Sequence, residues 1–245
     1  DGLLGWSQDW VGTGWSIELM DISRKNVGLK WQDNPEWISV SDAYVLTLNG
    51  AGYDLVPSGQ NAGQPGRYYA KDNPGLYLEL KTGATANELG WYWIARTPDG
   101  TTYELGNTGN SEQVLHRVYE GLVSNRSTYR WRLQQATDLN GNRLTVTYHE
   151  LVQDCGGGNR DVASVLSKIS YNYVGSQPMT EVTFVRGMEP QPVPYEWVIF
   201  GDPGTLQQIE VRHLGQQLRR YVLTYGVSSA GRRYLDTVKI GRAHV

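Results

Sequence analysis

Hydrophobic and polar residues alternate with a period of two along most of this 245-residue chain. A period of two places every second side chain on the same face of a β-strand, whereas a helix repeats after about 3.6 residues. The helical period is nearly absent. Alternation is clearest in the stretches 15–19, 44–48, 76–80, 129–133, 144–148, 169–173, 195–199 and 221–225. The pattern therefore predicts a succession of β-strands.

Turn residues separate these alternating stretches. Two-residue turns that close β-hairpins need residue types that tolerate a positive φ. Three dipeptides of this kind are Asn49-Gly50, Asp99-Gly100 and Asn140-Gly141. Leu214-Gly215 is a weaker signal in the same position. The pattern predicts hairpins at 91–96/101–106, 129–137/143–149 and 206–213/216–225.

Successive hairpins predict an all-β fold, in which consecutive antiparallel hairpins form a large wound sheet with little or no helix. The stretch 110–122 has imperfect apolar spacing, so a helix and a loop with one helical turn both fit it. The polar stretch 58–66 and the proline-rich stretch 185–194 read as loops, and neither is long enough to mark a domain boundary. We therefore expect a single β-sheet region over residues 1–239.

The composition agrees with this class. The chain has 29 Gly, 16 Tyr and 9 Trp but only 2 Phe, which suits short strands joined by tight turns. The formal net charge is −3, which argues against a nucleic-acid partner because nucleic-acid binders present a basic face. No run of about 18 apolar residues occurs, so we predict no membrane-spanning helix.

The stretch WVGTGWSIELMDISRK (10–25) places two glycines between two tryptophans. A phosphate-binding loop needs a helix after its glycines, but here the residues alternate as a strand. The simpler interpretation is that Gly12 and Gly14 let the backbone turn past Trp10 and Trp15. Trp15 is then expected to anchor the first strand, and Arg24 to close it.

This stretch and four others resemble segments of large secreted RHS/YD-repeat proteins, which include toxin-complex B components. The other segments are DAYVLTLNGAGYDLVP (42–57), RYYAKDNPGLYLEL (67–80), WYWIARTPDGTTYELG (91–106) and YRWRLQQATDLNGNRLTVTY (129–148). Their order and spacing make the resemblance more specific than any one segment. From residue 165 onward the resemblance is to strand rhythm only, which points to the non-repetitive N-terminal part of such a protein.

The resemblance implies that family members wind β-hairpins into a hollow shell that encloses or displays a C-terminal toxin or effector. The partner is then the remainder of the same polypeptide, and the protein is expected to be secreted or on the bacterial cell surface. The residues that the resemblance assigns to structural positions are Gly12, Gly14, Trp15, Arg24, Asn49, Gly50, Asp99, Gly100, Tyr103, Gly106, Trp131, Asp138, Gly141, Asn142 and Tyr148.

The function that follows is a non-enzymatic structural β-shell module, with any enzymatic activity in a C-terminal effector. The alternative is a carbohydrate-binding β-sandwich that recognises cell-surface glycans through exposed aromatic rings. Its candidate stacking residues are Trp31, Trp37, Trp91 and Trp93. A third interpretation is a glycoside hydrolase fragment. It is weaker, because such an enzyme needs two carboxylates about 5–10 Å apart and the sequence alone cannot place them.

Other candidate chemistry is sparse, and we predict no catalytic, cofactor-binding or metal-binding residue and no cofactor. His116, His149 and His213 lack metal-ligand spacing, and no G-x-S-x-G motif surrounds any serine. Cys155 is the only cysteine and lies in a glycine-rich loop. The segment 138–142 resembles the start of a calcium loop but lacks the later glutamate, so a tight hairpin fits it better.

The last residues, IGRAHV (240–245), resemble the translation of a sequencing adaptor. We therefore expect residues 1–239 to be a fragment of a longer reading frame, and His244 to have no functional role. An isolated wall fragment leaves a strand edge open, which predicts aggregation or poor solubility.

Overall fold

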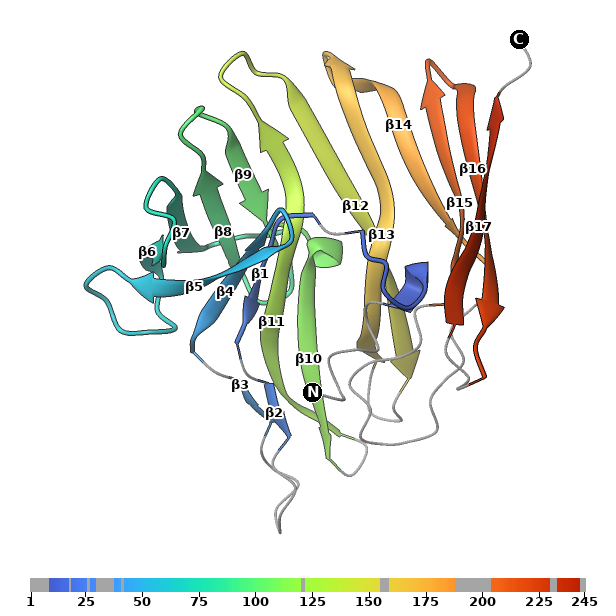
Figure 1. Ribbon diagram of the computed structural model, residues 1–245. Helices are drawn as coiled ribbons and strands as arrows, with labels where there is room; N and C mark the ends of the chain where they lie inside the picture. The colour runs from blue at the N-terminus through green and yellow to red at the C-terminus, as the bar shows by residue number, and fades with distance from the viewer. Residues whose placement is uncertain are drawn as a thin grey trace. The chain divides into compact units, whose positions relative to one another are not determined.

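A computed structural model describes residues 9–17, 19–25, 27–29, 38–40, 42–119, 122–154, 159–187, 204–229 and 233–242 of the protein. The described part is almost entirely antiparallel β-strand, with two short 3₁₀ turns, η2 (Asp9–Val11) and η3 (Gly109–Ser111) (Figure 1). The predicted all-β class with little helix is confirmed. None of the helical segments in this described part is long and apolar enough to cross a membrane.

The chain divides into two compact units. The first, which we call the ring unit, comprises Glu18–Gly141 and Asp154–Asp161. The second, the open-sheet unit, comprises Asp1–Ile17, Asn142–Gln153 and Val162–Val245.

Eight strands of the ring unit pair in the order β1-β4-β5-β6-β7-β8-β9-β11, and β11 pairs back with β1 to close the sheet. The closing register places Ile22 of β1 opposite Trp131 of β11, and the same Ile22 opposite Leu46 of β4. The strands of the closed sheet are β1 (Asp21–Arg24), β4 (Tyr44–Leu48), β5 (Ala51–Pro57), β6 (Gly66–Ala70), β7 (Tyr77–Thr82), β8 (Trp91–Arg96), β9 (Thr102–Leu105) and β11 (Leu122–Thr137).

Three further strands belong to this region. The strand β10 (Glu112–Tyr119) pairs with β11, and β2 (Val27–Leu29) pairs with β3 (Ile38–Val40) in a separate small sheet. The described residues of the stretch 110–122 are therefore mostly strand, and the turn η3 accounts for their helical character. The imperfect apolar spacing of the stretch was compatible with a helix or loop, but pairing with the long strand β11 decides the outcome.

The alternation of the sequence determines which residues fill the closed sheet. The inward positions of β7 and β8 are Leu78, Leu80, Trp93 and Ala95, which are at most 1% exposed. Residues between them, such as Tyr77 and Arg96, lie on the outward face. Burying one side of every strand supplies the hydrophobic stabilisation of this unit.

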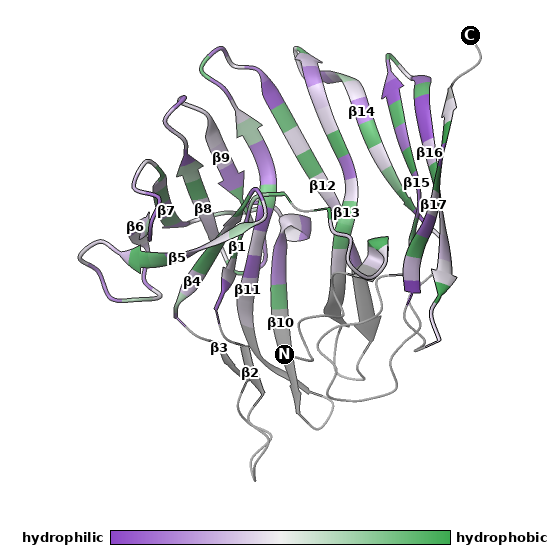
Figure 2. Ribbon diagram, viewed as in Figure 1, coloured by the Kyte–Doolittle hydropathy of each residue, from purple (hydrophilic) through white to green (hydrophobic). Residues whose placement is uncertain are grey.

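The open-sheet unit is built from six long strands that pair in chain order, although the end of the first and the start of the second belong to the ring unit. They are β12 (Arg143–Asp154), β13 (Asn159–Val174), β14 (Gln177–Arg186), β15 (Leu206–His213), β16 (Gln216–Val227) and β17 (Arg233–Arg242). Hydrophobic and hydrophilic residues alternate along β14 and β16 (Figure 2). One face carries apolar pairs such as Phe184–Ile209 and Leu223–Val238, and the other carries the ion pair Lys168–Glu181 at 2.7 Å.

Two of the predicted hairpins are found with nearly the expected bounds. They are β8–β9, closed by Asp99-Gly100, and β15–β16, closed by Leu214-Gly215. In the second turn Leu214 has a φ of 51° and Gly215 one of 79°, so this weaker sequence signal forms a genuine positive-φ turn. The strand spans expected at 129–137 and 143–149 lie within β11 and β12.

The strand expected at 15–19 is absent, because Trp15, Ser16 and Ile17 lie outside any strand and β1 begins only at Asp21. Trp15 is 59% exposed and anchors no strand. The buried tryptophan of this segment is Trp10, whose ring lies 6.3 Å from that of Phe184. Alternation was misleading here, because three alternating residues after a glycine turn need not be hydrogen-bonded to a neighbouring strand.

Gly12 explains how the N-terminal segment can approach the sheet so closely. Its φ is +93°, and a Cβ on it would lie 2.8 Å from the backbone nitrogen of Leu235 and 3.2 Å from the backbone carbon of Tyr234. The next residue, Thr13, donates its backbone N–H to the carbonyl of Arg233 at 2.8 Å. Gly14 also has a positive φ, +84°, but has open space around its Cβ position.

Candidate functional site

The interior of the closed sheet is filled by four aromatic side chains. They are Tyr44, Tyr68, Trp93 and Trp131, and each is at most 1% exposed. They come from β4, β6, β8 and β11, which are every second strand of the ring. Small closed sheets fill their interiors in this way, with the side chains of one layer drawn from alternate strands.

The four rings contact one another edge to face. Tyr44 lies 5.6 Å from Tyr68, 5.1 Å from Trp93 and 5.7 Å from Trp131, measured between ring centroids. Trp93 also lies 5.0 Å from Tyr68 and 6.2 Å from Trp131. Each such pair stabilises a core by about 0.5–1.5 kcal/mol beyond its buried area. The aromatic layer is therefore a packed core.

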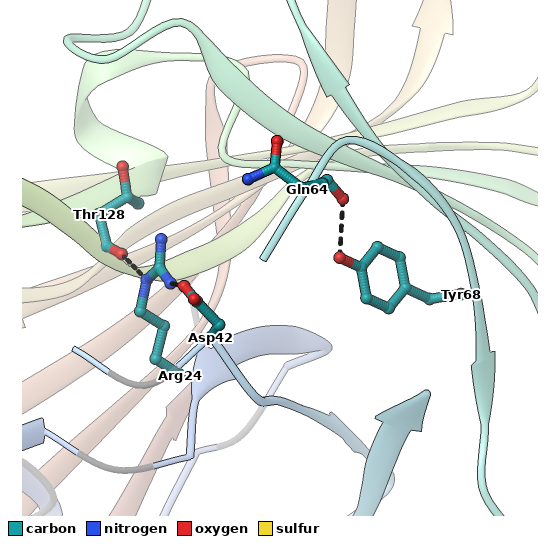
Figure 3. A network of polar contacts seen from close by, with 5 residues as sticks. All are labelled: Arg24, Asp42, Gln64, Tyr68 and Thr128. Carbon is teal, nitrogen blue, oxygen red and sulfur yellow. Dashed lines mark hydrogen bonds and ion pairs between the residues drawn. The ribbon is translucent and has the colours of Figure 1, made fainter. Parts of the chain in front are cut away.

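Arg24 lies over two rings of this aromatic layer, and Figure 3 shows its contacts with Thr128 and Asp42. Its guanidinium carbon is 5.2 Å from the centroid of Tyr44 and 5.7 Å from that of Trp131. Its Nε donates to the backbone carbonyl of Thr128 at 2.8 Å, and its Nη1 contacts Asp42 Oδ1 at 3.3 Å. The Arg24 side chain is only 11% exposed, so its charge is held by ring faces, a carbonyl and one carboxylate.

Burial raises the pKa of Tyr44 to about 12, and the nearby charge of Arg24 opposes that shift. The phenol therefore stays neutral over the whole physiological range. Burial also raises the pKa of Tyr68, whose hydroxyl donates to the backbone carbonyl of Gln64 at 2.7 Å (Figure 3). Neither tyrosine is set up as a proton donor or acceptor near neutral pH.

The loop after β5 lies against the carboxylate of Asp42. Gly63 of this loop has a φ of +79°, and a Cβ there would lie 2.5 Å from Asp42 Oδ1. A side chain at this position would displace either the loop or the partner of Arg24. The glycine is therefore required by both the backbone conformation and the available space.

Gly106 and Trp131, which the sequence placed in different motifs, meet in the structure. A Cβ on Gly106 would lie 2.2 Å from Trp131 Cδ1, and Gly106 has a φ of +72°. The indole Nε1 of Trp131 donates to the carbonyl of Trp91 at 2.9 Å. Asn87 donates its amide to the carbonyls of both Trp91 and Gly106, at 2.8 and 2.6 Å. These contacts fix the indole in one orientation.

Glu112 is a buried carboxylate that the sequence reasoning missed. It is 1% exposed, and its Oε2 accepts the backbone N–H groups of Glu88 at 2.7 Å and Leu89 at 3.3 Å. Its Oε1 accepts the hydroxyl hydrogen of Thr128. Glu112 therefore ties the loop before β8 to β10 and β11. A glutamate at the start of a strand carries no sequence signal for this role.

The turn residues of the family motifs occupy tight hairpins. Asn49 and Gly50 both have a positive φ and close the β4–β5 hairpin. A Cβ on Gly100 would lie 2.5 Å from Leu139, so the turn at Asp99-Gly100 packs against the turn at 138–141. The Asp138 carboxylate accepts the backbone N–H of Asn140 at 2.9 Å, as in a turn of this type.

The other motif residues lie apart from the aromatic layer. Tyr103 is on β9 opposite Ala95 and Ala136. Asn142, Tyr148, Gly12, Gly14 and Trp15 belong to the open-sheet unit. The structure thus brings together Arg24, Gly106 and Trp131, and it places the remaining motif residues in turns or elsewhere in the two sheets.

The geometry does not assemble a catalytic arrangement within the described residues. No group of three or more His, Cys, Asp or Glu side chains that could hold a metal ion is found there. His149 is exposed, and His213 Nδ1 lies 3.0 Å from the hydroxyl of the buried Thr180. The side chain of His116, together with Cys155 and His244, lies outside the described residues.

A cavity of about 360 Å³ lies in the open-sheet unit. Its lining includes His149, Ser167, Phe184 and Arg186. No carboxylate is among the described residues that line it.

Of the four tryptophans that would serve a carbohydrate platform, Trp91 and Trp93 lie in the described part of the chain. Trp93 is fully buried in the aromatic layer, so it cannot stack on a sugar. Trp91 is half-buried, and its carbonyl is bonded by Trp131. Trp31 and Trp37 lie outside the described residues.

The fold class that this geometry defines, a wound antiparallel sheet, is shared with a bacterial effector protein. The N-terminal domain of effector protein SpvB from Salmonella typhimurium strain LT2 matches with a TM-score of 0.67 and 16% identity, over 98% of this chain and 92% of that one. The crystal structure of TcdB2-TccC3-TEV matches with a TM-score of 0.58 and 15% identity, over 94% of this chain but only 13% of that one.

At these identities the likeness shows the fold. The sequence itself matches no protein-family model. It also matches none of the curated proteins. The two structural matches each extend over both compact units of this chain.

Proposed function

We propose that this chain is a structural β-sheet module of a toxin-complex or RHS-type secreted protein, and that it helps to enclose or display a C-terminal effector. The observation that carries the proposal is the fold that it shares with the N-terminal domain of SpvB and with part of TcdB2-TccC3. This chain covers only 13% of the TcdB2-TccC3 chain, so the shared fold is one part of that longer chain.

The interior of the ring unit supports a structural role. Closed sheets that bind ligands leave room inside, whereas here four interlocked aromatic rings and Arg24 fill the space. Charged groups around them have partners: Asp42 pairs with Arg24, and Glu112 binds backbone N–H groups. Such an arrangement fixes the sheet.

The edge of the open-sheet unit supports a partner within the same polypeptide. In the described part of the chain, β17 pairs with β16 on one side and has no strand on the other, where Thr13 of the N-terminal segment bonds only to its first residue, Arg233. Val238 on this strand is 49% exposed. An exposed edge with apolar side chains recruits another strand. A following strand of a longer wall would satisfy it.

The reading frame beyond residue 239 in the source DNA tests this proposal. We expect YD repeats followed by a C-terminal domain of another class. A stop codon directly after this region, or a following sequence typical of an unrelated enzyme, would contradict the proposal.

The open edge can be tested on the chain itself. We expect the wild-type chain to self-associate as its concentration rises in size-exclusion chromatography with light scattering. Val238→Lys should suppress this association, because a lysine on an edge strand opposes pairing. Val174→Lys is the matched control, since Val174 is 68% exposed at a hairpin end remote in sequence from β17. Equal behaviour of both variants would rule out the edge as the contact.

A further inference from the structure

The outward face of the ring unit carries a row of alternating tyrosine and arginine side chains, which we call the Tyr–Arg ladder. It consists of Tyr69, Arg67, Tyr77 and Arg96. The guanidinium carbon of Arg67 lies 5.2 Å from the ring centroid of Tyr69 and 5.1 Å from that of Tyr77. The guanidinium carbon of Arg96 lies 5.2 Å from the centroid of Tyr77.

The sheet order explains how the ladder forms. The strand β7, which carries Tyr77, lies between β6 and β8. Arg67 comes from β6 and Arg96 from β8, so the two guanidinium groups approach Tyr77 from neighbouring strands on opposite sides. Stacking on a ring holds a guanidinium group in place before any ligand arrives, which lowers the entropy cost of binding.

Neither arginine of the ladder has an acidic partner among the described residues. Arg67 is directly opposite Glu79 in the β6–β7 register. The Glu79 carboxylate instead accepts a hydrogen bond from the hydroxyl of Tyr77 at 3.1 Å. Arg67 and Arg96 are both exposed, and their side chains form no ion pair or hydrogen bond with any other described residue. Their N–H donors are therefore available.

The chemistry of a stacked, unpaired guanidinium group defines its ligand. Its planar fork of N–H donors matches a carboxylate, which it binds through two parallel hydrogen bonds. Two such forks on either side of one tyrosine would take two carboxylates of one ligand. An exposed lysine would offer charge without this planar geometry.

We propose that the Tyr–Arg ladder binds an acidic segment of a partner protein. Tyrosine and arginine are enriched among the residues that dominate protein–protein binding. Beside the ladder, Val56 pairs with Tyr69 in register, and these two side chains are 48% and 42% exposed, which adds apolar contact area. A sugar would need a free ring face to stack on, but guanidinium groups lie over the rings of Tyr69 and Tyr77.

The experiment measures binding of a fluorescein-labelled oligo-glutamate peptide to the whole chain by fluorescence anisotropy at low and physiological salt. The double variant Arg67→Gln/Arg96→Gln should weaken binding about a hundredfold, because each lost charged hydrogen-bond pair is worth about tenfold. Arg67→Lys/Arg96→Lys should recover only part of the loss, since it restores the charges without the planar forks.

The matched control is Arg219→Gln/Arg220→Gln, which removes two exposed arginines of β16 and the same net charge. We expect this control to bind the peptide like the wild type, and circular dichroism should show that every variant keeps its fold. Equal loss in the control would overturn the proposal, because the binding would then follow net charge. Absence of peptide binding would also overturn it.

Polygalacturonate and heparin serve as competitors that carry anionic groups on sugars. Displacement of the peptide by either polymer at much lower concentration than by unlabelled oligo-glutamate, with the same arginine dependence, would assign the ladder to an acidic glycan and overturn the protein partner. All of these outcomes are independent of whether the chain is a wall segment, since that proposal rests on the fold and on the edge at β17.

Discussion

Gly106→Ala should destabilise the protein through a collision that can be located atom by atom. The new Cβ would lie 2.2 Å from Trp131 Cδ1 and 2.8 Å from its Cγ, and real Cβ contacts are not this short. The indole cannot rotate away freely, because its Nε1 donates to the carbonyl of Trp91 and the rings of Tyr44 and Trp93 pack against it. The position also has a φ of +72°, which an L-residue adopts at a cost.

The magnitude follows from two separate terms. A positive φ costs a non-glycine residue about 1–2 kcal/mol. Forcing an extra methyl into a packed core costs about 1–3 kcal/mol more. We therefore expect a loss of about 2–5 kcal/mol in the free energy of unfolding, measured by urea denaturation with tryptophan fluorescence.

Gly141→Ala is the control that separates the two terms. Gly141 has a φ of +80°, close to that of Gly106, but nothing lies within 4 Å of its Cβ position. It should cost only the backbone term of about 1–2 kcal/mol. If Gly106→Ala were no more destabilising than Gly141→Ala, the tight packing of Trp131 in the aromatic layer would be refuted.

Three further predictions concern other parts of the structure. Glu112→Gln should lower the free energy of unfolding by about 1.5–3 kcal/mol, because the glutamine amide has one oxygen that accepts hydrogen bonds where the carboxylate has two. An unchanged urea midpoint would show that Glu112 does not hold the loop before β8 in place. The pKa of Tyr44, raised to about 12 by burial, means that its contribution to stability is present below about pH 10 and is lost between about pH 10 and 12. Thermal denaturation at a series of pH values should show this loss as a fall in melting temperature. Tyr44→Phe should make that fall less steep but leave the part due to Tyr225, whose pKa is also about 12. An equally steep fall in the variant would count against the buried phenol. Gly12→Ala should destabilise more than Gly14→Ala, since both have a positive φ but only Gly12 lies against backbone atoms; the reverse order would contradict the docking of the N-terminal segment.

Periodicity predicted the faces of the strands well. The set Leu76, Leu78 and Leu80 is buried as its alternation required, and the dipeptide at 99–100 closes the hairpin that it indicated. Such signals are local, because they depend on side chains and φ angles within one hairpin. They say which face of a strand is buried but do not say which distant strand will cover it.

The closure of the ring could not be predicted for this reason. It depends on pairing Ile22 with Trp131, which are more than a hundred residues apart in sequence, and no local pattern encodes that contact. The role of Glu112 was missed because its burial is created by the loop that it binds. Trp15 shows the opposite error, since its alternation with Ile17 looked like a strand but no neighbouring strand pairs with that segment in the described residues.

A structure of the protein encoded by the complete reading frame, determined by cryo-electron microscopy, tests the central claim most directly. If this chain is one segment of a wall, the free edge of β17 will be hydrogen-bonded to a strand that follows it in the same polypeptide, and the aromatic layer of the ring unit will remain closed to ligands. A β17 edge that stays open to solvent, or a ring whose interior binds a substrate, would contradict the account.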